Sequence, residues 1–415
     1  MKTKPILLVT ASTFPRWEND SEPRFVYDLC SHLSDSFNVL VLAPGAPGAN
    51  AFDQWGKLKV YRYRYAPKSL QTLAYNGGIT ANLKQSYWKY FLLPGFFFGQ
   101  WWSLRRLLKQ FSISAIHAHW LIPQGLVAAL AIMGKKTRPA LLCTSHGGDL
   151  YGLQDPISTR LKKWVIRHSD GVSVVSTAMS QKVQGLVNPF PCPINIIPMG
   201  TDLQHTFVPL HECKRTPHQL LFTGRLVEKK GLKYLLHALK VVIHYFPATT
   251  LIVAGSGPER PALETLVESL GLRNHVTFKG RLTHTELVDL YRESALAVFP
   301  FIQTKDGDME GLGLVMIEAL GCGCPVIASD LPAVHDVISH NETGYLVPPG
   351  DEKALGKKIV ACMKSPTEIQ AMAVNAHPGI LQRFDWQSVT KDYELLLQRM
   401  IPVKPYESAD FIVGR

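Results

Sequence analysis

Short apolar runs alternate with amphipathic, helix-like segments along the whole chain. In the first half, the apolar runs predict strands at Ile6–Val9, Val39–Ala43, Lys59–Tyr63, Ala115–His117, Ala140–Thr144, Gly171–Val175 and Asn195–Ile197. In the second half, they predict strands at Gln219–Phe222, Thr250–Ala254, Val276–Phe278, Ala295–Phe299, Pro325–Ala328 and Gly344–Val347. Helical periodicity covers Gly231–His244, Pro261–Leu270 and Thr285–Glu293. Buried strands separated by helices of this length are typical of βαβ units with parallel sheets.

The two series of strands predict an α/β protein of two doubly wound, Rossmann-like domains that face a cleft. We expect the first domain over residues 1–205, a linker over 206–218 that contains Pro209 and Pro217, and the second domain over 219–383. The amphipathic stretch Trp386–Met400 predicts a final helix within a C-terminal segment of residues 384–415. A length of 415 residues is enough for two or three domains, each with its own core.

Positive charge is concentrated in the first half of the chain. The net charge is +11, and residues 1–205 carry 22 basic and 10 acidic side chains, whereas the remainder is nearly balanced. Such a surface favours an anionic partner, whether nucleic acid, anionic lipid or a phosphorylated substrate. No nucleic-acid recognition motif accompanies the charge, which disfavours the first of these. The seven cysteines include no CxxC pair, so we expect neither a disulfide framework nor a zinc ribbon, and a reducing compartment such as the cytosol.

Neither a secretion signal nor a membrane span is expected from the two most suggestive apolar stretches. Ile6–Val9 is four residues long, against the roughly 7–15 apolar residues of a signal peptide. Phe91–Leu104 is interrupted by Pro94, Gly95 and Gly99 and falls short of the ~18 apolar residues of a spanning helix.

The segment Ser86–Phe111 nevertheless combines aromatic and basic residues in an unusual density. Its aromatic side chains are predicted to precede a helix with a leucine stripe, and Arg105, Arg106 and Lys109 occupy the other side of that helix. Basic amphipathic segments with aromatic anchors suit a membrane surface. A core element with a solvated basic face is the alternative, and the sequence leaves both open.

Chemistry is most strongly indicated by the segment from Glu310 to Glu318. A loop containing Gly311 and Gly313 follows a predicted strand and opens a helix, so backbone amides are left bare for a phosphate or a sugar hydroxyl. Glu310 stands at this opening, and Glu318 lies about two turns along the helix. Carboxylates repel a diphosphate, so we expect these two to meet hydroxyl groups. The alternative is a solvated helix with two unrelated glutamates.

A basic turn follows the first predicted strand of the second domain. Arg225 comes directly after Thr223-Gly224, and Lys230-Gly231 precede the next helix. The planar fork of arginine and the point charge of lysine together suit a diphosphate. A solvated basic turn is the alternative.

Taken in order, these segments resemble the nucleotide-sugar half of the retaining glycosyltransferases with the GT-B fold, the family-four group. The resemblance rests on Gly224-Arg225-Leu226, Lys230-Gly231, Gly255-Ser256-Gly257-Pro258 and the Glu310/Glu318 pair. Ile197–Asp202 resembles the segment that closes the family's first domain. Phe384-Asp385-Trp386 resembles the entry to a C-terminal helix that, in the family, crosses back onto the first domain.

The resemblance implies a role for each matching residue on the donor side. Arg225 and Lys230 would bind the diphosphate and neutralise the departing nucleoside diphosphate, so that neither a metal nor another cofactor is required. Glu318 would bind the ribose, and Arg281 would lie at the base pocket. The donor sugar would be held by Glu310 and by the amides around Gly311, Leu312, Gly313 and Leu314.

Thr144–Asp149 follows a predicted strand and resembles the family's histidine loop, which faces the reacting sugar. His146 would donate to a donor hydroxyl or stabilise developing charge, and Asp149 would orient it or bind the acceptor. A histidine that caps the strand end is the alternative. His117 and His119 share one face of a strand but lack a nearby third metal ligand, so acceptor contact or packing is expected of His119.

The loop after the first strand departs from the family pattern. Many relatives carry a glycine pair there, near the diphosphate, whereas residues 12–25 of this chain contain no glycine. We expect Arg16 or Arg24 to substitute for it, and Asn19 and Asp20 to lie on the acceptor side.

These inferences converge on a cytoplasmic retaining glycosyltransferase at the inner face of the membrane. It would transfer a hexose from a nucleoside-diphosphate sugar to a saccharide or lipid-linked saccharide in polysaccharide or glycolipid synthesis, with an anionic membrane surface as a further partner. Glu310–Gly313 resembles the corresponding segment of mannosyltransferases in the family, and this resemblance favours GDP-mannose over UDP sugars. A nucleotide-sugar epimerase of the same fold and a catalytically silent saccharide- or lipid-binding scaffold are the alternatives.

Overall fold

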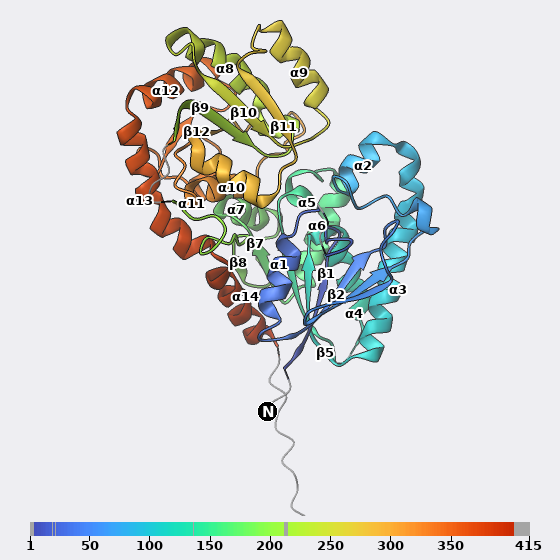
Figure 1. The fold of residues 1–415 in the computed structure, drawn as a ribbon. Helices are drawn as coiled ribbons and strands as arrows, with labels where there is room; N and C mark the ends of the chain where they lie inside the picture. The colour runs from blue at the N-terminus through green and yellow to red at the C-terminus, as the bar shows by residue number, and fades with distance from the viewer. Residues whose placement is uncertain (1–3, 19, 21, 136, 211–214, 402–415) are drawn as a thin grey trace, which may run out of the picture.

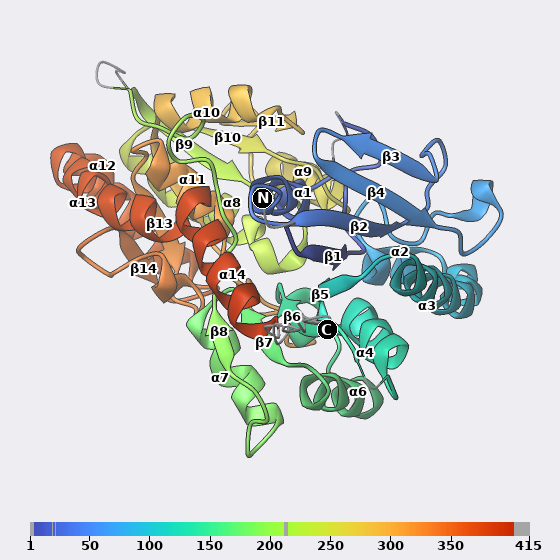
Figure 2. The ribbon, with the colours of Figure 1, turned by 90° about the horizontal axis from the view of Figure 1, so that it is seen from below.

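The computed structural model describes residues 4–18, 20, 22–135, 137–210 and 215–401. Within these residues, the first sheet has eight strands in the order β3-β4-β2-β1-β5-β6-β7-β8. The strands are β1 (Ile6–Thr10), β2 (Asn38–Pro44), β3 (Phe52–Trp55), β4 (Leu58–Tyr63), β5 (Ile113–His119), β6 (Ala140–Ser145), β7 (Gly171–Val174) and β8 (Ile194–Ile196). The helices around this sheet are α1 (Phe25–Leu33), α2 (Ile79–Gln85), α3 (Leu93–Gln110), α4 (Leu126–Ile132), α5 (Gly148–Tyr151), α6 (Pro156–Arg167) and α7 (Thr177–Leu186) (Figure 2).

The second sheet has six strands in the described residues, in the order β11-β10-β9-β12-β13-β14, and all its neighbours are parallel. Its strands are β9 (Thr216–Thr223), β10 (Thr250–Ala254), β11 (Val276–Gly280), β12 (Ser294–Phe299), β13 (Val326–Ser329) and β14 (Tyr345–Val347). Its helices are α8 (Leu232–Tyr245), α9 (Arg260–Ser269), α10 (His284–Glu293), α11 (Leu314–Gly321), α12 (Glu352–Lys364) and α13 (Pro366–Phe384). The two sheets form two lobes, one above the other in Figure 1.

Every strand predicted from an apolar run is present, and the structure adds β3. This strand pairs with β4 in the only antiparallel ladder of the described sheets, with Gly56 at φ +57° in the turn. Its four residues alternate in exposure and form no apolar run, because an edge strand of a hairpin is half solvated. The inner strands β1, β2, β5, β6 and β7 are parallel and mostly buried, which is why their apolar runs were readable.

The aromatic residues of the segment Ser86–Phe111 were predicted to precede a helix, which is correct for Trp88 and Phe91 but wrong for the others. Helix α3 already begins at Leu93, with Pro94 in its first turn. Proline is tolerated there because the first amides of a helix have no intrahelical acceptor. Phe96–Phe98, Trp101 and Trp102 therefore lie inside the helix, with Phe96 buried on its inner face.

The last helix, α14 (Trp386–Met400), leaves the second lobe and packs against the first, as Figures 1 and 2 show. Its apolar stripe includes Val389, Tyr393 and Leu397, which share one core with Leu7 and Val39 of the first sheet. The chain thus has the predicted architecture of two doubly wound domains with a returning C-terminal helix.

The chain crosses between the lobes at two places that are hydrogen-bonded to each other. On the first crossing, the Thr201 amide donates to the carbonyl of Phe384 at 2.9 Å. The Asp385 carboxylate on the second crossing accepts from the Leu203 amide at 3.2 Å and from the Gln204 side chain at 2.8 Å. Asp385 also caps α14 through the Gln387 amide. One buried carboxylate therefore starts the returning helix and fixes it to the outgoing chain.

Among the described residues, no helix is both long enough and apolar enough to cross a bilayer.

Candidate active site

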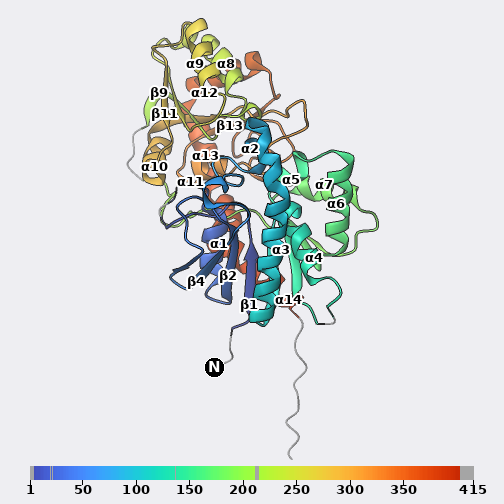
Figure 3. The ribbon, with the colours of Figure 1, turned by 90° about the vertical axis from the view of Figure 1, so that its right-hand side faces the viewer.

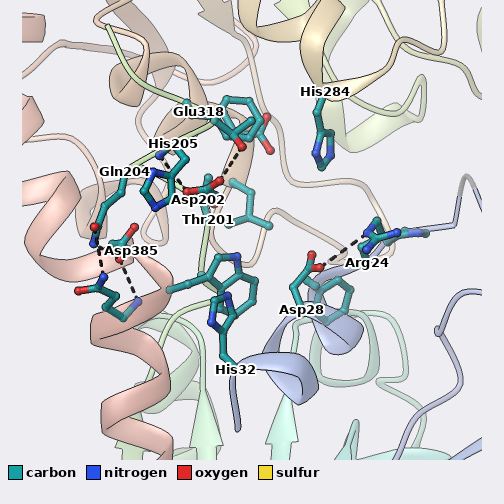
Figure 4. Close-up of a pocket in the computed structure, with 18 residues that line it drawn as sticks. Arg24, Asp28, His32, Thr201, Asp202, Gln204, His205, His284, Glu318 and Asp385 are labelled. Carbon is teal, nitrogen blue, oxygen red and sulfur yellow. Dashed lines mark hydrogen bonds and ion pairs between the residues drawn. The ribbon is translucent and has the colours of Figure 1, made fainter. Parts of the chain in front are cut away.

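A cavity of about 490 Å³ lies between the two lobes. Residues of α1 and the loop before it line one wall, and the first crossing, His284, Leu314 and Glu318 line the others. Figure 4 shows Glu318 and His284 opposite Arg24 and Asp28, which form an ion pair at 3.7 Å. Burial raises the pKa of Asp28 to about 6, although Arg24 acts in the opposite direction. Both domains thus contribute polar groups to one enclosed space.

Lys230 and Glu310 form a close ion pair in the second lobe. Their Nζ and Oε2 atoms lie 2.6 Å apart, and both side chains are largely buried. Burial opposes ionisation of Glu310, but the charges of Lys230 and Lys229 outweigh it and lower the pKa of Glu310 to about 2. Lys230 also rests over the Phe301 ring at 4.7 Å. The carboxylate at the mouth of α11 is therefore ionised and held by a lysine.

Glu318 is in a different electrostatic state from Glu310. It is half-buried, and desolvation raises its pKa to about 7, although the Tyr291 hydroxyl donates to its Oε2 at 3.1 Å. Tyr291 is fixed in turn by Thr223 at the end of β9, 2.6 Å away. Glu318 consequently titrates near neutral pH and faces the cavity with one oxygen constrained.

Arg225 reaches from the second lobe to the first. Its Nη1 donates to the Gly77 carbonyl at 2.9 Å, and a Cβ on Gly77 would overlap Nη2. Burial lowers the pKa of Arg225, and the nearby charge of Arg281 lowers it further. Arg281 in turn donates to the Ser256 hydroxyl at 3.0 Å. Two cations held this close together favour an anionic ligand between them.

The glycines before α11 allow the lobes to approach closely. Gly313 caps the helix with φ +87°, a conformation that other residues rarely adopt. A Cβ on Gly311 would lie 3.0 Å from the carbonyl oxygen of His146, in the opposite lobe. Leu312, between these two glycines in the sequence, is fully buried. Leu314 is the first residue of α11 and lines the cavity. The predicted donor-sugar loop thus lies directly against the predicted histidine loop.

His146 is the outermost of three neighbouring histidines, and its ring stacks on that of His119. Its Nε2 is 2.8 Å from Nδ1 of His119, whose ring lies 4.1 Å from that of His117. Burial lowers the pKa of His146 and His117 to about 3 and holds the pKa of His119 well below its usual value, so all three are neutral. His119 was predicted to contact the acceptor or to pack, and the structure buries it beneath His146 as that residue's hydrogen-bond partner. No group of three or more potential metal ligands is found in the described part of the chain.

The predicted acceptor-side carboxylates Asp149 and Asp20 are buried and bound to neighbouring groups of the protein. Asp149 is buried and accepts from the Leu121 amide and the Ser145 hydroxyl, each at 2.6 Å, so it fixes its own loop. Asp20 is also buried and binds Arg16 through two side-chain contacts at 2.7 and 2.8 Å. In each case the carboxylate satisfies local donors that the sequence could not place. Asn19 lies outside the described residues.

Three residues that the sequence did not single out take part in the cleft: Gly77, Asp28 and His284. Gly77-Gly78 is itself a glycine pair, and it lies against Arg225 although it is far in sequence from the loop after β1. A search for glycine pairs anywhere in the first domain would have found it. Nothing in the local sequence marks Asp28 or His284, because their place depends on how the lobes meet.

Two facing Rossmann-like domains with a returning C-terminal helix define the GT-B fold, and solved structures agree. Sucrose-phosphate synthase from Thermosynechococcus elongatus superposes with a TM-score of 0.78 at 23% identity, covering 95% of this chain and 98% of that one. HepE of Anabaena, in complex with UDP and glucose, superposes with a TM-score of 0.72 at 17% identity, covering 95% and 100%.

Sequence models of two families match consecutive parts of the chain. "Glycosyltransferase Family 4" matches residues 23–205, and "Glycosyl transferases group 1" matches residues 210–377. The chain belongs to this family of group 1, family-4-type glycosyltransferases.

Curated relatives of the chain are distant. Glycogen synthase of Mycobacterium tuberculosis is 27% identical over 278 residues, which is 66% of each protein. A GDP-mannose-dependent alpha-(1-6)-phosphatidylinositol monomannoside mannosyltransferase of the same species is 23% identical over 85% of this chain and 87% of its own length. The match to glycogen synthase thus spans just under two thirds of that relative's length. The match to the amylovoran biosynthesis glycosyltransferase AmsK of Erwinia amylovora spans about half of its length.

Proposed function

We propose that the protein is a retaining hexosyltransferase that uses a nucleoside-diphosphate sugar. The observation that carries the proposal is the gathering of Arg225, Arg281 and Lys230 beside two acids in different ionisation states, Glu310 and Glu318. The cations suit the diphosphate, ionised Glu310 suits the sugar hydroxyls, and Glu318 at the cavity wall suits the ribose. Family membership supports the same assignment.

In the proposed reaction, the acceptor hydroxyl attacks the anomeric carbon from the side on which the diphosphate leaves. The new glycosidic C–O bond forms, the bond between the anomeric carbon and the phosphate oxygen breaks, and the hydroxyl proton passes to the departing diphosphate. Arg225 and Lys230 neutralise the charge that develops there, so the proposal requires no metal ion. Neutral His146 donates a hydrogen bond to the donor sugar and excludes water from it.

GDP-mannose is the donor we propose. The sequence Glu310–Gly313 supports it, as does the relative whose name specifies GDP-mannose. UDP-glucose is the natural comparator, because HepE has been solved with it. The acceptor we propose is a saccharide or lipid-linked saccharide in polysaccharide or glycolipid synthesis, at the cytoplasmic face of the membrane.

A thermal-shift screen of nucleoside-diphosphate sugars, followed by turnover measurements with the best donor, tests the proposal. We expect Arg225→Ala and Lys230→Ala each to lower kcat/KM at least a hundredfold and to weaken nucleotide binding, since each removes a charge-assisted contact in a partly buried site. Arg273→Ala, which removes an exposed arginine of the same lobe, is the control and should behave as wild type. Unchanged donor binding in both site variants would refute the diphosphate assignment.

The stereochemical outcome is tested separately, by NMR of the product. An inverted anomeric centre would contradict the retaining mechanism while leaving the donor site intact. Product formation without any acceptor would instead identify an epimerase.

A further inference from the structure

An exposed aromatic surface covers one side of the first domain. It consists of Tyr87, Trp88, Tyr90 and Phe91 in η2 (Tyr87–Leu92), together with Phe98 and Trp102 in α3. Phe91 is 86% exposed, and Phe98 and Trp102 are each 61% exposed. Of the nine highly exposed Phe, Tyr and Trp side chains in the described residues, six lie on this surface. Apolar side chains this dense and this exposed mark an interaction site.

The aromatic surface continues into a basic stripe on the same helix. The inner face of α3 is occupied by Phe96, Gln100, Leu104 and Leu107, which are buried. On the outer face, Phe98, Trp102, Arg106 and Lys109 follow one another at spacings of four, four and three residues and are all exposed. Residues so spaced form one line along a helix. Two exposed aromatic rings are thus followed along the helix by two exposed cations.

No acidic side chain belongs to this part of the chain at all. From residue 54 to residue 148, the sequence contains thirteen lysines and arginines and not one aspartate or glutamate. The charges also lie close together in space. Arg105 and Lys109 are near enough to Lys135, in the loop after α4, to lower its pKa, although burial is the larger cause of that shift. Among the described residues, ion pairs join Lys57, Arg62 and Arg138 of this range to Asp35, Asp53 and Asp170, and Lys84 to Asp306 of the other lobe, whereas none involves Arg105, Arg106 or Lys109 of α3. The surface therefore presents rings and positive charge without compensating carboxylates.

Helix α2 connects this surface to the contact between the lobes at Gly77. Figure 3 shows α3 along the side of the first lobe and α2 above it, at the level where the lobes meet. The turn before α2 contains Gly77, which contacts Arg225. Ten residues separate that contact from Tyr87. A partner bound to η2 and α3 is thus linked through α2 to the contact that holds Arg225.

We infer that the η2–α3 surface docks onto an anionic lipid bilayer, with its rings at the level of the head groups and its basic stripe on the lipid phosphates. Charge complementarity selects this occupant. A second copy of the chain would bring an equally basic, acid-free face against the first, and like charges oppose such pairing. Docking in this orientation turns the α2 side of the contact between the lobes toward the membrane. The inference rests on the proposed function in one respect only, namely that the molecule collected at the membrane is a lipid-linked acceptor.

Flotation of the full-length protein with vesicles of phosphatidylcholine, or of phosphatidylcholine with phosphatidylglycerol, tests the inference. Wild type should bind the anionic vesicles at least tenfold better than the neutral ones, and high salt should weaken this binding. Phe91→Ser with Trp102→Ser should lower binding to anionic vesicles at least tenfold. Arg106→Glu with Lys109→Glu should abolish the preference for anionic lipid.

Two matched variants in the other lobe serve as controls. Tyr245→Ser removes an exposed ring, and Arg273→Glu reverses an exposed charge, and both should bind vesicles as wild type does. All the substituted side chains are exposed, so each variant should keep the thermal stability and donor affinity of wild type. Absence of wild-type binding to anionic vesicles, or full binding by the Phe91/Trp102 variant, would overturn the inference.

Self-association is the competing use of the surface. A concentration-dependent dimer in sedimentation velocity that the Phe91/Trp102 variant disperses would also overturn the inference. Flotation contains neither nucleotide nor acceptor, so it can succeed when donor binding fails, and donor binding can succeed when flotation fails. The inference and the proposed function are thus tested independently.

Discussion

At the scale of single residues, the two glutamates of the cleft show what the sequence could and could not predict. Their spacing and the glycines between them pointed to ligand-binding chemistry. Their different ionisation did not follow from spacing, because it depends on Lys230, which lies 80 residues before Glu310 in the chain. The same lysine pairs with Glu310, so a diphosphate must compete with a carboxylate for it.

The raised pKa of Glu318 leads to a pH dependence of donor affinity. Below pH 7 the folded protein holds a proton on Glu318, and this proton must leave before both oxygens accept from ribose hydroxyls. We therefore expect affinity to rise between pH 6 and pH 8, being about tenfold weaker at pH 6 than at the plateau, since a single group one unit below its pKa is about one-tenth ionised. Calorimetric titration across this range measures it.

Glu318→Gln is the control for that titration. It cannot ionise, so its donor affinity should be weaker than that of wild type and flat between pH 6 and pH 8. A sloping profile in this variant would assign the titration to another group. Protein stability should follow the opposite sign, because a carboxyl whose pKa is raised on folding loses stabilisation as the pH rises through 7.

At the scale of elements, buried parallel strands were predictable and partly solvated ones were not. The thirteen predicted strands contain apolar residues that the local sequence identifies, whereas β3 is defined by its pairing with β4. Helix α3 shows a second limit, since Pro94 and Gly95 suggested an interruption where the helix begins. Helix α14 was recognisable from its apolar stripe, and its packing on the first domain was implied by the family resemblance.

Helix α14 contributes strongly to stability through its first residue. Trp386 is buried, stacks on His32 with ring centroids 5.4 Å apart, and fills the space that a side chain at Gly200 would need. We expect Trp386→Ala to lower the free energy of unfolding by about 3–5 kcal/mol, as for other buried tryptophans. Leu395→Ala, on the exposed side of the same helix, should change it by less than about 0.5 kcal/mol. Urea denaturation followed by circular dichroism compares the two, and equal effects would contradict the packing described.

At the scale of the whole molecule, function depends on contacts between lobes that no local sequence pattern encodes. The sequence predicted a cleft and named Arg225, but not its contact with the Gly77 carbonyl across that cleft. Arg16 and Arg24, the predicted substitutes for the missing glycine pair, have different surroundings in the structure. Arg24 lines the interdomain cavity, whereas Arg16 is bound to Asp20.

Two neighbouring glycines make a matched pair for testing the interlobe contact. Gly77 and Gly78 have φ of +120° and +88°, so alanine at either position should cost about 1–3 kcal/mol of stability through backbone strain. Only the Gly77 methyl group would meet Arg225, because open space surrounds the corresponding position at Gly78. We expect kcat/KM to fall at least tenfold in Gly77→Ala and less than twofold in Gly78→Ala. Equal losses of turnover would show that strain, not displacement of Arg225, is responsible.

The paired crossings near Thr201 and Asp385 have a mechanical consequence. Two independent tethers would let one lobe tilt, slide and twist against the other. Two chain segments hydrogen-bonded side by side act as a single hinge, which the Asp385 carboxylate holds together. We therefore expect the lobes to move mainly by rotation about one hinge axis. Each closure then brings the same two faces of the lobes together, and the loss of conformational entropy on closure is small.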